Sequence, residues 1–205
     1  MSSEIMSLEM DVFCLLLLIR ILYQMYINRE QNDHWNYFYY TIAWACVYLF
    51  MDAIWIMNVK HFLTFSKIQS GIFNSFYFCS LAMLVCSWYI YVQKTLHSAV
   101  LKHKKILVLT FIPLIFFIGS SLLSYWTHGL FVIDQAGNYH RGKLLPFYFL
   151  ILFAYILYLS IKAGSLSKKA KNYLYQKEYK VIARFSFLPF ITALIQITVD
   201  HVFLL

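Results

Sequence analysis

Long runs of apolar residues, separated by short polar segments, occupy most of the chain. Six of them qualify as membrane-spanning helices, because about 20 residues at a 1.5 Å rise cover the ~30 Å hydrocarbon core of a bilayer. The pattern predicts an all-α polytopic membrane bundle, in which residues 1–205 form a single membrane domain with no room for a soluble one. The six expected transmembrane helices are approximately residues 10–27, 36–58, 70–94, 106–126, 144–161 and 181–201.

The composition agrees with a membrane protein, since 61% of the residues are hydrophobic and only 13% are charged. The first apolar run differs from a signal peptide, because Glu4, Glu9 and Asp11 stand where basic residues are expected. No small-residue cleavage site follows it, so we expect this run to be retained as a helix.

The Lys and Arg residues are unevenly divided between the two sides of the predicted bundle. Cytoplasmic loops are enriched in these residues, so their distribution predicts the orientation in the membrane. Four basic residues lie in the second and fourth loops: Lys60, Lys67, Arg141 and Lys143. Eleven lie in the first, third and fifth loops: Arg29, Lys94, Lys102, Lys104, Lys105, Lys162, Lys168, Lys169, Lys171, Lys177 and Lys180. We therefore expect a multi-pass membrane protein with its N-terminus outside.

The fourth loop, residues 127–143, has the pattern of a short extracytoplasmic β-hairpin. Residues 131–133 favour extended backbone, residues 134–138 supply turn formers, and residues 139–141 can pair back. The hairpin would lie over the outer ends of the helices; the alternative is a plain connector with a turn. A metal site from His128, Asp134 and His140 is conceivable, but loop residues without supporting partners make it a weak candidate, and we expect no metal.

Polar residues within membrane spans are costly, so their clustering is informative. Four of them are expected in the outer half of the bilayer: Asp52, Asn74, Gln196 and Asp200. They would line a ligand pocket open to the outside, with Asp52 and Asn74 in contact. Trp55 and Trp126 would form its walls, and His140 and Arg141 its lid. Alternatively, Asp52 and Asn74 only form hydrogen bonds between helices, and Asp200 lies at the interface.

The chain lacks the residue patterns of common catalytic sites. No nucleophile elbow, zinc-protease motif, glycine-rich phosphate loop or paired cysteine motif is present. Cys14, Cys46, Cys79 and Cys86 all fall within predicted helices, where small apolar side chains serve packing. We therefore expect no enzyme activity and no cofactor.

Several segments of the chain resemble a known family of membrane signalling proteins. They are residues 48–55 (YLFMDAIW), 72–77 (IFNSFY), 87–92 (SWYIYV), 122–126 (LLSYW), 132–142 (VIDQAGNYHRG) and 187–189 (FLP). Together they resemble the N-terminal membrane region of GGDEF-type diguanylate cyclases and related sensors of Firmicutes. The most specific match is the outer loop motif, which contains Asp134, Gly137, Tyr139, His140, Arg141 and Gly142.

The resemblance implies a sensory input module in a bacterial cytoplasmic membrane, which detects an extracytoplasmic or membrane signal and controls a cytoplasmic output. The family has a seventh helix before its output domain, whereas this sequence ends at Leu205, so cyclase activity is not expected of it. The expected partners are the lipid bilayer, a small-molecule ligand from outside, and a cytoplasmic output domain or partner protein. A homodimer remains open, and no nucleic acid is expected. The alternative function is a small transporter or carrier subunit with Asp52 and Asp200 as coupling acids.

Overall fold

The computed structural model describes residues 3–27, 33–59, 62–63, 65–135 and 139–186. Within these ranges five long helices are each long and apolar enough to cross a membrane. They are α1 (Ser3–Ile27), α2 (Asp33–Val59), α3 (Lys67–Thr95), α4 (Lys104–Thr127) and α5 (Leu145–Lys169). A short 3-10 helix, η1 (Ala99–Lys102), precedes α4, and residues 173–186 are also helical. The predicted all-α membrane bundle is confirmed, although most of its sixth span, 181–201, lies outside the described residues.

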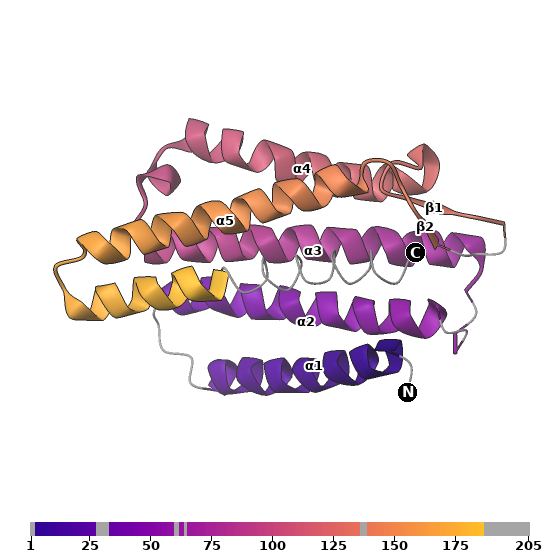
Figure 1. Cartoon of the computed structure of the whole chain (residues 1–205), viewed down its shortest axis with the longest axis horizontal. Coiled ribbons are helices and arrows are strands. Elements are labelled where there is room, and N and C mark those ends of the chain that lie inside the picture. Colours follow the sequence, from indigo (N-terminus) through magenta and orange to yellow (C-terminus); the bar gives the residue numbers. More distant parts are fainter. Residues whose placement is uncertain (1–2, 28–32, 60–61, 64, 136–138, 187–205) are drawn as a thin grey trace.

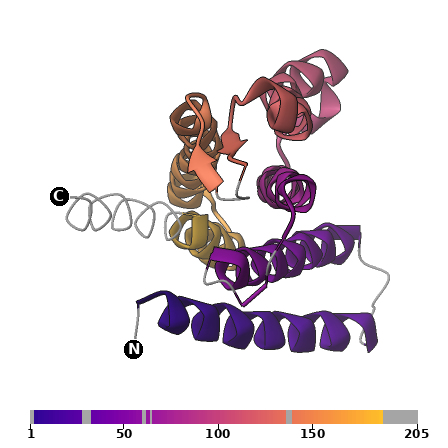
Figure 2. The same cartoon turned by 90° about the vertical axis from the view of Figure 1, so that its right-hand side faces the viewer.

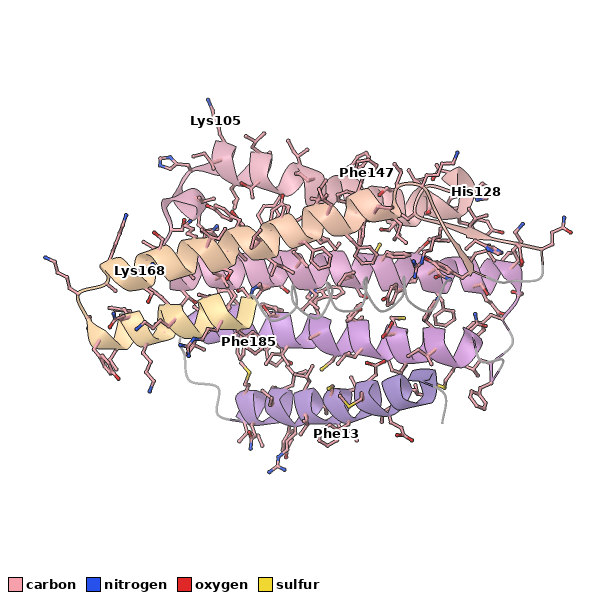
Figure 3. All side chains as sticks on the ribbon, viewed as in Figure 1. Phe13, Lys105, His128, Phe147, Lys168 and Phe185 are labelled. Carbon is pink, nitrogen blue, oxygen red and sulfur yellow. The ribbon has the colours of Figure 1, made fainter. Side chains whose placement is uncertain are left out.

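The long helices run side by side along the longest axis of the molecule (Figure 1). Strands β1 (Phe131–Ile133) and β2 (Tyr139–Arg141) lie at one end, which we call the hairpin end. Lys105 and Lys168 lie toward the other end (Figure 3), which we call the basic end. Helix α3 occupies the centre and packs against α2, α4 and α5, whereas α1 lies at the edge against α2 (Figure 2).

Two clusters of buried side chains form the core, and both are built around α3. The first joins α3, α4, α5 and the hairpin, and includes Phe78, Phe117, Phe131 and Tyr148. The second joins α3 and α5 to the helical residues 173–186 at the basic end, through Tyr89, Leu159 and Ile182 among others. Among the described residues, neither cluster of buried side chains contains a member from α1 or α2.

The outer surface of the bundle is apolar along the long helices. Phe13 on α1 is 59% exposed and Leu109 on α4 is 69% exposed, and many other large apolar side chains are also exposed. Such a continuous apolar surface would promote aggregation in water. It suits hydrocarbon, in which each helix satisfies its own backbone hydrogen bonds.

Two tyrosines of α5 connect that helix to its neighbours. The Tyr148 hydroxyl donates to the backbone carbonyl of Phe78 in α3, and the Tyr155 hydroxyl donates to that of Thr110 in α4. Pro113 lies inside α4 and removes one backbone donor from this part of the helix. The Tyr155 bond therefore links α5 to α4 one residue after Leu109, whose carbonyl lacks the donor that Pro113 cannot supply.

The predicted hairpin is confirmed. Its strands are antiparallel, with Phe131 opposite Arg141 and Ile133 opposite Tyr139. The Ser124 hydroxyl, near the end of α4, accepts hydrogen bonds from the backbone N–H groups of Leu130 (2.9 Å) and Phe131 (3.1 Å). Phe131 and Ile133 are buried, so the hairpin is part of the core and holds a fixed position at the end of the bundle.

The basic end differs from the prediction, because α5 continues to Lys169 and does not end near residue 161. Its buried stripe continues through Leu159, Ala163 and Ser167, and packs against residues 173–186. The next helical segment begins at residue 173, where the Asn172 side chain accepts a hydrogen bond from the N–H of Leu174 at 2.9 Å. The expected loop over residues 162–180, between the fifth and sixth predicted spans, is therefore wrong. Helix α5 and the segment 173–186 both extend beyond their most apolar stretches because they pack on each other.

Candidate functional site

Two acidic side chains meet between α1 and α2 within the apolar part of the bundle. Asp11 lies near the start of the apolar stretch Leu8–Ile27 of α1, and Asp52 lies toward the end of the stretch Asn36–Asn58 of α2. Their carboxyl groups are within hydrogen-bonding range of each other. A bond between two carboxyl groups requires a proton on one of them. Asp11 Oδ2 is enclosed and has no hydrogen-bond partner among the described residues.

Two tyrosines extend this acid pair to the central helix. The Tyr77 hydroxyl on α3 is within hydrogen-bonding range of the Asp52 carboxyl group. The hydroxyls of Tyr77 and Tyr48 are 3.2 Å apart, and their ring centroids are 5.3 Å apart. Asp11, Tyr48, Asp52 and Tyr77, which we call the acid–tyrosine cluster, therefore connect three neighbouring helices.

The spacing of these residues explains why the cluster forms. Tyr48 and Asp52 are four residues apart, so both lie on the same face of α2, toward α3. Asp52 lies six residues before Asn58, which corresponds to a depth of about 9 Å along the helix. A charged group at this depth is costly, and two adjacent carboxylates also repel one another. A proton or a small cation held between them removes the repulsion, so the cluster can respond to either.

Asn74 is buried as expected, at 3% exposure, but it does not share a hydrogen bond with Asp52 in the described structure. Its side-chain N–H donates to the backbone carbonyl of Ser70 on the same helix at 2.8 Å, and its Oδ1 has no partner among the described residues. The expected contact between Asp52 and Asn74 is replaced by the contacts of Asp52 with Asp11 and Tyr77.

Of the remaining predicted pocket residues, Trp55 and Trp126 are described, and they have different surroundings. The Trp55 ring on α2 lies edge-on to the Tyr139 ring, with centroids 5.8 Å apart, so the hairpin packs over the end of α2. Trp126 is 71% exposed and rests against Tyr125, so it does not wall a shared pocket with Asp52. Gln196 and Asp200 lie outside the described residues.

The outer loop motif forms the second strand and the turn beside it. His140 Nε2 lies 3.4 Å from Asp134 Oδ2, and the His140 side chain is 61% exposed. Burial raises the pKa of Tyr139 to about 12, against a smaller opposing effect of the nearby Arg141 charge. The backbone N–H of Gly142 donates to the Leu130 carbonyl at 2.9 Å. Gly137 lies outside the described residues, as do its neighbours in the turn.

The proposed lid and metal roles of the hairpin receive no direct geometric support. His140 and Arg141 are both exposed on β2, and Tyr139 is the motif residue that contacts α2. His128 ends α4 in a left-handed conformation with a φ of 55°. Within the described ranges, no group of three or more metal-binding side chains occurs.

The sequence identified Asp52 but not the partners that complete its site. In the sequence, Asp11 argues only against a signal peptide, and Tyr48 and Tyr77 occur only within the segments that carry the family resemblance. One signal was available, because an acid inside the first apolar run is as costly as Asp52 in the second. The packing order of the helices decides which helix faces Asp52. The pattern of apolar residues does not reveal that order.

No protein-family model matches the chain, and no curated protein or solved structure matches it significantly. Its class is therefore defined by its structure. It is an all-α polytopic membrane protein with a β-hairpin at one end and a polar cluster joining three helices within the apolar region.

Proposed function

We propose that this protein is the membrane-embedded input module of a bacterial signalling protein, without catalytic activity of its own. The observation that carries the proposal is the acid–tyrosine cluster, which joins α1, α2 and α3 through ionisable side chains. The signal would arrive from the hairpin side, which we place outside the cell. The resemblance to the membrane region of diguanylate cyclases supports the same role.

The cluster supplies a physical basis for sensing. A signal can shift the balance between two helix arrangements only if it interacts differently with each of them. Gain or loss of a proton or small cation at Asp11 and Asp52 changes the repulsion between α1 and α2, so the charge of the pair would select the arrangement. Because Asp52 also contacts Tyr77, a change in α2 is transmitted to the central helix α3.

Hydrogen bonds also connect α3 and α5 to the last described helical segment, residues 173–186. The Trp88 indole N–H on α3 donates to the Ser186 hydroxyl at 3.1 Å. The Ser160 hydroxyl on α5 donates to the Ala183 carbonyl at 2.8 Å. A shift of α3 relative to α5 would therefore be felt by residues 173–186, which lead toward the expected output domain or partner.

The transporter alternative is less well supported. A transporter needs polar groups that continue across the bilayer. On α3 the side chain of Tyr77 belongs to the acid–tyrosine cluster, and Gln93 is wholly buried near the basic end. These two are separated by roughly 24 Å of helix, and the buried residues between them are mostly apolar: Phe78, Ser80, Ala82, Val85, Tyr89 and Val92.

The function can be tested by fusing the whole chain, through an added seventh transmembrane helix, to a diguanylate cyclase domain. In cells, cyclic dinucleotide production should change several-fold when the medium is shifted from mildly acidic to mildly alkaline, or when its sodium or magnesium concentration is raised. The same cyclase on an unrelated membrane anchor serves as the control. Constant output under every condition would contradict sensing by the cluster.

The orientation gives a separate prediction, which rests on the excess of basic residues at one end. A reporter active only in the cytoplasm should work when fused after Lys104 or Lys171. The same reporter should fail after Lys67 or Asn138, because these positions are placed outside. Activity at Asn138 would place the hairpin in the cytoplasm and reverse the direction of the proposed signal.

A further inference from the structure

A half-buried lysine lies at the basic end, away from the acid–tyrosine cluster. Lys162 on α5 donates from Nζ to the side-chain oxygen of Gln93 at 2.7 Å and to the hydroxyl of Ser98 at 2.7 Å. Its ammonium also lies 5.6 Å from the centre of the Tyr158 ring. Among the described residues these partners are all uncharged, so the positive charge is not matched by a carboxylate.

The end of α3 builds the two acceptors. His97 has a φ of 48°, and its N–H donates to the Lys94 carbonyl while that of Ser98 donates to the Gln93 carbonyl. This is the Schellman arrangement of a helix end, and it brings Ser98 back beside Gln93. The position of the Lys162 ammonium is therefore set by backbone geometry and two side chains, unlike that of a freely moving surface lysine.

Among the side chains that the structure describes, basic ones outnumber acidic ones around this site. The C-terminal end of a helix carries about half a negative charge, so the end of α3 only partly offsets Lys162. Lys94, Lys105, Lys168 and Lys169 lie in the same part of the molecule. Glu178 is the acidic residue whose side chain the structure describes at this end, and its charge acts on Tyr91 and Tyr179.

Gln93 shows that the site is built to hold the ammonium. It is 0% exposed, its side-chain oxygen accepts from Lys162, and its Nε2 has no hydrogen-bond partner among the described residues. Burying an amide is costly unless it is bonded, so Lys162 stabilises Gln93 by supplying the donor for its oxygen. An ammonium has three N–H donors and Lys162 uses two here, which leaves one for a ligand at the half-exposed surface.

We propose that Lys162 binds the phosphate of an anionic phospholipid. The neighbours of Lys162 favour a lipid over a soluble anion, because Tyr158 is 46% exposed and Ile161 is 64% exposed. These side chains belong to the exposed apolar surface, on which acyl chains would pack. Lys162 lies near the basic end of the candidate span Leu145–Lys169, so we expect it at the depth of the headgroups.

The test places the full chain in nanodiscs of phosphatidylcholine with a minor fraction of phosphatidylglycerol, and measures retained lipid by native mass spectrometry. Lys162→Gln keeps an N–H donor for Gln93 but removes the charge. It should bind phosphatidylglycerol about tenfold more weakly or worse, because it loses a direct hydrogen bond between charged groups, which contributes about 1.5 kcal/mol or more. Lys162→Arg keeps the charge and should retain the lipid, as should Lys168→Gln on the exposed end of α5.

Retention of phosphatidylglycerol by Lys162→Gln, or an equal loss in Lys168→Gln, would overturn the proposal. The wild-type protein alone also tests the proposal. If it retains the two lipids in the same ratio in which they were supplied, a specific site is refuted. A third measurement compares the melting temperature of the protein in nanodiscs of phosphatidylcholine alone, in buffers that contain either inorganic phosphate or chloride. Stabilisation by phosphate that depends on Lys162 would assign the site to a soluble anion and exclude the lipid.

Discussion

Gly142→Ala is expected to destabilise the protein by about 3 kcal/mol or more, and to displace the hairpin. A Cβ atom at Gly142 would lie 2.2 Å from the Gly129 carbonyl oxygen and 2.5 Å from the Leu130 carbonyl carbon. Both are backbone atoms, and the Leu130 carbonyl also accepts the hydrogen bond from the Gly142 N–H. Relief of the clash therefore requires movement of the segment that carries Leu130 and Phe131 in the core.

Gly119→Ala provides the matched control for this substitution. A Cβ atom at Gly119, inside α4, would meet no other atom within 4 Å. Alanine favours a helix over glycine by about 1 kcal/mol, so this variant should be as stable as the wild type or slightly more so. Urea unfolding in detergent micelles measures both, and equal stability of the two variants would show that the hairpin does not depend on the close approach at Gly142.

Asp52→Asn should abolish the response of the cyclase fusion to the outside medium. Asparagine has nearly the same shape and keeps hydrogen-bonding groups for Tyr77, but it cannot gain or lose the charge that repels Asp11. If the cluster couples the signal to the output by about 1–3 kcal/mol, the substitution should remove a five- to 150-fold effect of the signal. Asp11→Asn should have the same result, because the charge belongs to the pair.

Leu17→Ala on α1 is the control for helix packing. Leu17 is 46% exposed on the apolar surface, so its truncation should change the response little. The readout is cyclic dinucleotide production across the same media, with membrane levels of each fusion compared by immunoblot. A normal response in both aspartate variants would leave the cluster as a packing feature and place the signal elsewhere.

The helices and the hairpin were predictable because their causes are local. Twenty apolar residues in succession can satisfy their backbone groups in lipid only as a helix. The hairpin followed from extended residues around Val132, a turn, and a return segment through Tyr139. These patterns act within one element, so they did not require knowledge of its neighbours.

The end of α5 and the partners of Asp52 depend on contacts between elements, and these were not predictable in the same way. Helix α5 continues past Ile161 because Ala163 and Ser167 pack on the next helical segment. Asp52 meets Asp11 because α1 lies beside α2 (Figure 2). Had α1 packed on another helix, the same sequence pattern would have predicted the same spans but a different site.

The placement of the core has a consequence for biosynthesis. Both buried clusters draw on α3, α5 and the segments around them, and the larger one needs the hairpin. Since the chain emerges from its N-terminus, α1 and α2 enter the bilayer before any of these side chains has its partners. Neither buried cluster can therefore be complete until α5 has been made, and the second must also wait for residues 173–186, so the late part of the chain sets the time at which this core forms.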